Sequence, residues 1–342
     1  MNDDYPDIPR VDAHIHPYSM EGRDRMIRIS RILKDKYDIN LEIWMDCADK
    51  DPSFGKPGVG LGDHREIYPS FLKEIRTRYN GRWMHRIGLG YSPEDIEYYQ
   101  SLGAVGCKMK PGRSIKREGD RWQDWLLGEK HEDTWEKMVE IGFVPGPVHI
   151  TSAYPGKYCD DPIEHWALHK DWEGILDRHP NLEVMMAHFW CHYGTDRDID
   201  YLRFLLHRYP NAYLDASGGC LHWVGTLDKE HLRRFVIDHS DRILFGSDFY
   251  KLFREHQLGR SATDEDFVFR YMYFFNRLER DHFKVPDFTD DATISPLHRD
   301  KNGESWGLDL PREALENIYY KNAARLYPQV DEKLEELGYQ TY

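Results

Sequence analysis

Short apolar runs alternate with amphipathic stretches along most of this chain. Eight runs have the length and composition of buried strands: Val11–Ile15, Leu41–Met45, Met84–Leu89, Ala104–Met109, Phe143–Ile150, Leu182–Ala187, Ala212–Leu214 and Ile243–Phe245. The stretches between and after them show helical spacing: Arg25–Lys36, Glu66–Tyr79, Glu94–Ser101, Thr134–Ile141, Pro162–Arg178, Ile199–Arg208, Lys229–Asp238 and Glu265–Arg277. An apolar run followed by a 3.6-residue period is typical of a βα unit. The pattern predicts eight such units.

Eight βα units in one chain favour a closed parallel barrel. An open doubly wound sheet is the alternative, but it should carry a glycine-rich phosphate loop after its first strand, where this chain reads His14-Ile15-His16-Pro17. We therefore expect an α/β fold, a (β/α)8 TIM barrel, as a single domain over residues 1–342. A last helical segment, Arg312–Leu326, and a charged terminal helix predict a C-terminal helical extension.

The segments that follow the predicted strands are long and rich in Gly, Pro and Trp. They are Cys47–Asp63, Lys110–Gly128, Thr151–Asp161, His188–Asp196, Ala216–Thr226 and Phe249–Thr263. In a barrel these βα loops gather on one face, where active sites are built. We expect the functional site at that C-terminal mouth.

Composition removes several classes of function. The net charge of −14 argues against a nucleic-acid partner, because phosphate binding needs clustered Lys and Arg. Five cysteines without a CxxC pair argue against a disulfide framework or a zinc knuckle. No apolar leader and no run of 18 apolar residues occur, so we expect a cytoplasmic protein that does not enter a membrane. The irregular stretch Phe283–Leu310 is where a homo-oligomer would form its contact.

The first candidate motif is Asp12-Ala13-His14-Ile15-His16, at the end of the first predicted strand. Side chains two residues apart on a strand share a face, so Asp12, His14 and His16 should all point into the barrel. Two such imidazoles can bind one metal ion. The motif alone is weak, because 18 histidines in 342 residues give about one HxH pair by chance.

Three further residues strengthen the metal hypothesis. His149 and His188 lie at the ends of the fifth and sixth predicted strands, and Asp248 follows the eighth. Singly, each has an ordinary explanation, since most histidines are core or surface residues and an Asp after Gly-Ser often caps a helix. Together they place divalent-metal ligands or proton acceptors from four strands at one barrel mouth.

At these positions the sequence resembles the amidohydrolase superfamily, in the branch of amidohydrolase-related hydrolases and aminocarboxymuconate-semialdehyde-type decarboxylases. The segments that carry the resemblance run in order from Val11 to Pro328. They are VDAHIH at its start, GCKMKP at Gly106–Pro111, PVHIT at Pro147–Thr151, MMAHF at Met185–Phe189, ILFGSDF at Ile243–Phe249 and ENIYYKNAARLYP at Glu316–Pro328.

The resemblance implies that His14, His16, His149 and Asp248 hold one divalent metal ion, zinc, with a water in its open position. It implies that His188 lies beside that water as an acid–base or orienting group. A bound zinc ion lowers the pKa of water to about 7, and Asp248 can accept the proton that the attacking water loses. We interpret Asp12, deeper on the same face, as a carboxylate that supports the ligands.

Lys108 lies where some superfamily members place a carboxylated lysine that bridges two metals. The alternative, which we favour, is an ammonium that binds an anionic substrate or a nearby carboxylate, because this branch resembles single-metal sites. Many relatives also carry glycines after the strand-six histidine, whereas this chain reads His188-Phe189-Trp190-Cys191-His192. These bulky residues put any borrowed substrate in doubt.

Cations and aromatic residues near the strand ends suggest what the site binds. The candidate substrate-binding residues are Lys108, Lys110, Arg113, Trp190 and Tyr250. Aromatic walls with a few cations fit a small unsaturated or ring-containing carboxylate. The plainer explanation is that a chain with 14% aromatic residues puts some in most long loops.

The sequence leaves three functions open. The first is a metal-dependent hydrolase that uses a metal-activated water on an amide, lactone or related carbonyl. The second is a lyase with the same ligands, a non-oxidative decarboxylase or hydratase of an unsaturated or aromatic acid. The third is a barrel that binds without turnover, against which the intact ligand set argues. No GxSxG nucleophile elbow is present.

Overall fold

The computed structural model describes residues 5–17, 19–47, 68–88, 92–109, 131–149, 162–192, 195–217, 227–250, 261–285, 300 and 302–341. Most of the predicted βα loops, with Lys110 and Arg113 among them, lie outside these ranges. No helix in the described ranges is long and apolar enough to cross a membrane.

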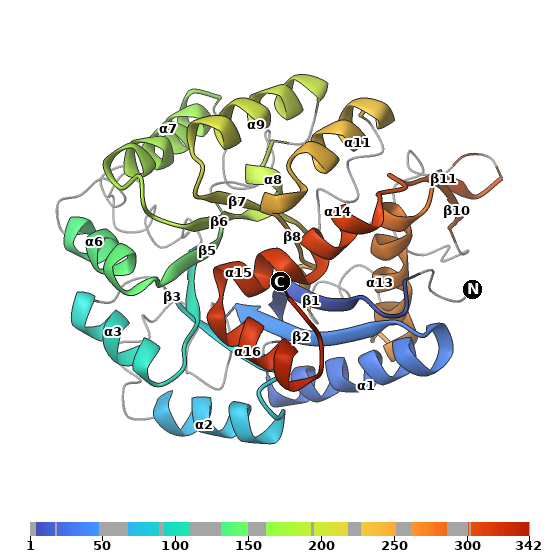
Figure 1. Cartoon of the computed structure of the whole chain (residues 1–342), viewed down its shortest axis with the longest axis horizontal. Helices are drawn as coiled ribbons and strands as arrows, with labels where there is room; N and C mark the ends of the chain where they lie inside the picture. The colour runs from blue at the N-terminus through green and yellow to red at the C-terminus, as the bar shows by residue number, and fades with distance from the viewer. Residues whose placement is uncertain are drawn as a thin grey trace.

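Parallel strands form a barrel whose order follows the chain (Figure 1). Its strands are β1 (Pro9–His16), β2 (Asn40–Cys47), β3 (Trp83–Gly88), β4 (Gly106–Met109), β5 (Val144–Val148), β6 (Val184–Met186), β7 (Ala212–Ala216) and β8 (Ile243–Phe245). The two-residue β9 (Phe249–Tyr250) follows β8 in the chain and pairs with β1, with Ile15 opposite Phe249. The Asp248 amide also donates to the His14 carbonyl at 2.7 Å. The predicted TIM barrel is confirmed, and the open sheet is excluded.

A ring of helices covers the outside of the barrel (Figure 1). Its main members are α1 (Met20–Tyr37), α2 (Tyr68–Arg78), α3 (Pro93–Ser101), α6 (Glu132–Ile141), α7 (Pro162–Arg178), α9 (Asp196–Arg208), α11 (Lys229–Asp238) and α13 (Asp264–Glu279). All eight residues of β1 are buried, as expected for a strand with the barrel interior on one side and helices on the other. This two-sided burial explains why the strands appear in the sequence as short apolar runs.

Local signals set the helix ends. The first helix begins five residues before its predicted start, because the Ser19 side chain caps it by accepting from the Gly22 amide at 3.1 Å. Thr195 and Thr263 open α9 and α13 with capping boxes, in which each threonine and the Asp three residues later satisfy one another's backbone amides.

The C-terminal extension closes the end of the barrel where the strands begin. It comprises α14 (Arg312–Glu316), a π-helical turn (Asn317–Lys321), α15 (Asn322–Leu326) and α16 (Pro328–Glu336). Buried Arg86 donates to the Ala13 carbonyl at 2.8 Å and to the Tyr327 hydroxyl at 3.1 Å, and Asn322 donates to the Ile243 carbonyl at 2.8 Å. With this end filled, the opposite mouth is the place for a site.

The stretch predicted to be irregular contains a short antiparallel pair. Strands β10 (His282–Lys284) and β11 (Glu304–Trp306) pair through Phe283 and Ser305. The prediction that this stretch contacts a second subunit stays a prediction.

A buried ionic cluster joins the outside of the barrel to its helices. Asp46 accepts from Arg23 at 2.6 Å and lies 2.5 Å from Nδ1 of His85. Burial alone would raise the pKa of Asp46, but His85 and Arg23 together lower it to about 2. The cluster therefore depends on an ionised carboxylate.

We expect Asp46→Asn to lower the free energy of unfolding by about 3 kcal/mol at neutral pH, because it removes the anion that offsets the buried charge of Arg23. The pKa of Asp46 is lower in the folded than in the unfolded chain, so its ionic contribution is present above the unfolded value of 3.8. It is lost as the pH falls through the folded value, about 2. Urea denaturation should show the wild-type advantage shrinking over that range; an advantage independent of pH would contradict this.

Candidate active site

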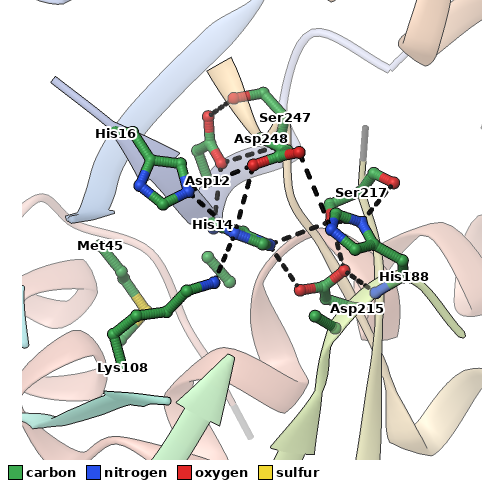
Figure 2. Close-up of polar contacts among 12 residues, drawn as sticks. Asp12, His14, His16, Met45, Lys108, His188, Asp215, Ser217, Ser247 and Asp248 are labelled. Carbon is green, nitrogen blue, oxygen red and sulfur yellow. Dashed lines mark hydrogen bonds and ion pairs between the residues drawn. The ribbon is translucent and has the colours of Figure 1, made fainter. Parts of the chain in front are cut away.

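Asp12, His14 and His16 all point into the barrel from β1, as the strand alternation predicts (Figure 2). All three are buried. The Nε2 atoms of the two histidines are 3.2 Å apart. Oδ1 of Asp248, from the end of β8, lies 3.4 Å from Nε2 of His14 and 3.2 Å from Nε2 of His16. These three atoms form an almost equilateral donor triangle.

The donor triangle has the dimensions that a metal ion requires. Ligands 2.0–2.1 Å from a tetrahedral zinc ion are separated from each other by about 3.3–3.4 Å. Two imidazole nitrogens and one carboxylate oxygen are also the donor types such an ion prefers. The Asp248 side chain keeps 23% of its surface exposed, so the triangle borders the mouth. His14, His16 and Asp248 therefore fit a divalent cation.

Gly246 explains how β8 brings Asp248 so close to β1. A Cβ atom at this residue would lie 2.7 Å from Cβ of His14 and 3.0 Å from Cβ of Ser217, which is closer than side chains pack. Asp248 itself has a φ of +51°, in the left-handed region that Asp tolerates better than most residues. The Gly-Ser-Asp sequence thus permits a close approach followed by a turn of the backbone.

His14 and Asp248 are in the protonation states that a metal ligand needs. Burial, and after it the nearby Lys108 charge, lower the pKa of His14 to about 3 against the opposing effect of Asp215 and Asp248, so its imidazole is neutral. Burial alone would raise the pKa of Asp248, but its histidine neighbours hold it well below its usual value. Nζ of Lys108 is 3.0 Å from Nε2 of His14 (Figure 2). The predicted lysine thus lies directly beside the donor triangle.

His188 and His149 lie next to one another at the mouth. Their ring centroids are 4.8 Å apart, and the His188 centroid is 5.2 Å from that of His14. Nε2 of His188 is 3.8 Å from Oδ2 of Asp248, on the side of that carboxylate away from the triangle. The structure therefore brings all five predicted strand-end residues to one place. That His149 is a fourth ligand stays a prediction.

The backbone that carries His188 is unusual. His188, Phe189, Trp190 and Cys191 all have φ between 50° and 61°, within and just after the short helix α8 (Ala187–Trp190). This left-handed conformation costs about 1–2 kcal/mol per non-glycine residue, so the surroundings must hold it. Bulky, buried side chains occupy this left-handed turn, where glycine would adopt the conformation without strain.

Two residues that the sequence patterns did not indicate also belong to the candidate site. Asp215, in β7, accepts from Nδ1 of His14 at 2.8 Å through Oδ2 and from the His188 amide at 2.8 Å through Oδ1. Ser217 lies beside both histidines and donates its hydroxyl to Asp215. The signal was present: Asp215-Ala216-Ser217 has the same alternation as the first-strand motif, but the predicted strand ended at Leu214.

Asp12 is buried beneath the triangle, in the barrel interior, and accepts four hydrogen bonds. It accepts from the Ser247 amide at 2.9 Å, the Ser247 hydroxyl at 2.6 Å, the Tyr271 hydroxyl at 2.6 Å and the His14 amide at 3.2 Å. Burial raises its pKa to about 6, against the effect of these hydrogen bonds. Asp12 therefore ties β1 to the Gly-Ser-Asp segment, and its role in supporting metal ligands stays a prediction.

The predicted substrate-binding residues are placed unevenly. Trp190 is 1% exposed and packs against Tyr209, with ring centroids 6.1 Å apart, so its position does not support the predicted substrate contact. The Tyr250 backbone pairs with His16 in β9, and its side chain lies outside what the structure describes. Of the five predicted, Lys108 alone is described at the donor triangle.

Comparison with known proteins gives a family match and several similar folds. The model of the family described as Amidohydrolase matches residues 78–329. The matched range contains His149, His188 and Asp248 but begins after His14 and His16. No curated protein matches the chain.

Three solved structures illustrate the similarity of fold. Dihydroorotase from Saccharomyces cerevisiae, in complex with 5-fluoroorotic acid, has a TM-score of 0.57 at 12% identity, over 94% of this chain and 84% of that one. A Burkholderia multivorans amidohydrolase with bound zinc has a TM-score of 0.52 at 12% identity, over 94% and 99%. A probable 2-pyrone-4,6-dicarboxylic acid hydrolase from Acinetobacter baumannii, with citric acid bound, has a TM-score of 0.51 at 12% identity, over 94% and 99%.

Proposed function

This chain belongs to the amidohydrolase family, and from that premise we propose that it is a metal-dependent hydrolase of a small carbonyl substrate. The observation that carries the proposal is the donor triangle of His14, His16 and Asp248, whose edges of 3.2–3.4 Å match those of a tetrahedral metal site. His149 is proposed as a further ligand. A bound divalent ion, proposed to be zinc, would supply Lewis-acid activation of water and of the substrate carbonyl.

The protein groups around the triangle have separate proposed roles. Oδ1 of Asp248 belongs to the triangle, and the same carboxylate accepts the proton that the attacking water loses. Nε2 of His188 lies 3.8 Å from Oδ2 of Asp248. A substrate oxygen bound near that carboxylate would therefore be close enough to form a hydrogen bond with Nε2 of His188. We propose that His188, once Nε2 has taken up a proton, donates it to the substrate carbonyl oxygen and so orients that carbonyl.

We propose that the substrate is a cyclic ester or amide that carries a carboxylate. Lys108 is 3% exposed and places an ammonium group beside the reacting centre, where it can pair with such a carboxylate. The structural neighbour described as a probable dicarboxylic acid hydrolase, with citric acid bound, supports the same substrate class. Lys110, Arg113 and Tyr250 stay proposed contacts to the rest of the substrate.

Metal removal is the direct test of this function. We expect the purified protein to contain one divalent ion per chain by elemental analysis, and chelation to abolish hydrolysis until zinc is restored. Two ions per chain would indicate that Lys108 is carboxylated and bridges them. A metal-free protein whose activity is indifferent to chelators would overturn the proposal.

A substrate panel separates the hydrolase from the lyase that shares its ligands. Carboxylated lactones and amides should release acid, measured at constant pH, whereas phenolic and muconate-type acids should release no CO2. Decarboxylation without hydrolysis would show that the same site catalyses the lyase reaction.

A further inference from the structure

Asp215 is hydrogen-bonded both to a triangle histidine and to the backbone of His188. It is fully buried at the end of β7, and Figure 2 shows it between the two histidines. One oxygen accepts from Nδ1 of His14 and the other from the His188 amide, each at 2.8 Å. We propose that Asp215 is a positioning residue that sets the tautomer of His14 and anchors the left-handed turn of His188. This inference rests on the proposed function.

The hydrogen-bonding capacity of the Asp215 carboxylate sets the tautomer of His14. An ionised carboxylate only accepts, so Nδ1 of His14 must carry the proton. Nε2 then keeps its lone pair and faces His16 and Asp248 in the donor triangle. Lys108, which only donates, lies 3.0 Å from that Nε2 and requires the same tautomer.

Asp215 also holds the backbone turn after β6. Four left-handed residues begin at His188, and the hydrogen bond from the His188 amide to Asp215 fixes the first of them. The His188 ring is then held by Ser217, whose carbonyl oxygen lies 3.2 Å from Nδ1. A carbonyl cannot donate, and the Ser217 hydroxyl, 2.9 Å from the same Nδ1, donates its proton to Asp215. Nδ1 of His188 therefore carries a proton, and Nε2 is left to face Asp248.

The same atoms do not form a second metal site. His14, His188 and Asp215 have potential ligand atoms within 4.8 Å of one another. However, Nδ1 of His14 and both oxygens of Asp215 already form hydrogen bonds, and Nδ1 of His188 faces Ser217. A metal there would have to displace this whole network. One carboxylate thus positions the proposed metal ligand and the proposed acid–base residue together.

Asp215→Asn tests the proposal because an amide can accept on one side only. The His188 amide cannot reverse its role, so the Asn oxygen should stay with it and the NH2 group should face Nδ1 of His14. His14 must then move its proton to Nε2, inside the donor triangle. Long-range proton–nitrogen NMR on histidine-labelled, metal-free protein should show this change at His14 and none at His188, with signals assigned from His14→Gln and His188→Gln.

Metal affinity gives the second readout. Calorimetric titration with zinc should show that Asp215→Asn weakens binding by about 10–100-fold. Ser217→Ala is the comparison within the network: it keeps the carboxylate, so His14 should keep its tautomer and zinc affinity should fall less than in Asp215→Asn. Asp46→Asn controls for loss of a buried carboxylate elsewhere and should bind zinc as the wild type does.

The outcomes separate this inference from the proposed function. A wild-type protein that binds no zinc would refute the proposed function, while the NMR measurement would still decide the role of Asp215. A wild type that binds zinc, with Asp215→Asn unchanged in both tautomer and affinity, would overturn the inference alone.

Discussion

Asp248→Asn should reduce hydrolysis by about 10³-fold or more and release the bound metal. The substitution keeps the shape of the side chain but removes the charge that balances the cation and the group that accepts the proton. Each tenfold loss of rate corresponds to about 1.4 kcal/mol of activation free energy. A metal ion stabilises the transition state by several kcal/mol, so a loss of this size is expected when it is released. Elemental analysis and steady-state rates, measured on the same preparation, would check both effects.

Two variants show whether such a loss is specific to the site. His14→Gln should have the same effect as Asp248→Asn, because it removes another vertex of the donor triangle. His85→Ala removes a histidine of similar burial outside the barrel, and we expect it to lose stability while it keeps the metal. If Asp248→Asn retained wild-type metal content and rate, the triangle would not be the reacting centre.

Gly246→Ala should damage the site without changing any ligand. The new methyl group would lie 2.7 Å from Cβ of His14 and 3.3 Å from its backbone nitrogen. Because backbone and Cβ atoms cannot rotate away, β8 must separate from β1 at the point where Asp248 meets His14 and His16. A shift of a few tenths of an ångström there should weaken zinc binding by at least about 10-fold, and overpacking should cost about 1–3 kcal/mol of stability.

The matched control for this variant is Gly142→Ala, at the C-cap of α6. No atom lies within 4 Å of the Cβ that it adds, although the φ of +64° makes it unfavourable for alanine. We expect a stability loss of about 1 kcal/mol with unchanged zinc affinity. Calorimetry and urea denaturation of both variants would separate a general glycine cost from damage to the triangle. Equal zinc affinity in the two would count against the packing argument.

The sequence by itself determined the barrel and most residues of the candidate site. Apolar runs and helical periods arise from each element's own burial, so they predicted all eight strands and the helices between them. Strand alternation likewise placed His14 and His16 on one face. Asp248 could be assigned to the mouth because parallel strands all end there.

Only the tertiary structure decided how these residues are joined. Asp215 lies 201 positions from His14 in the sequence and meets it because the barrel closes, which no local pattern encodes. The left-handed turn at His188 could not be predicted from the sequence either. Bulky residues rarely adopt that conformation, so their identity does not indicate it. Trp190 was placed by the same turn, which directs it into the core rather than to the mouth. Local periodicity fixes which face a residue occupies, whereas contacts between strand ends depend on closure and packing of the whole chain.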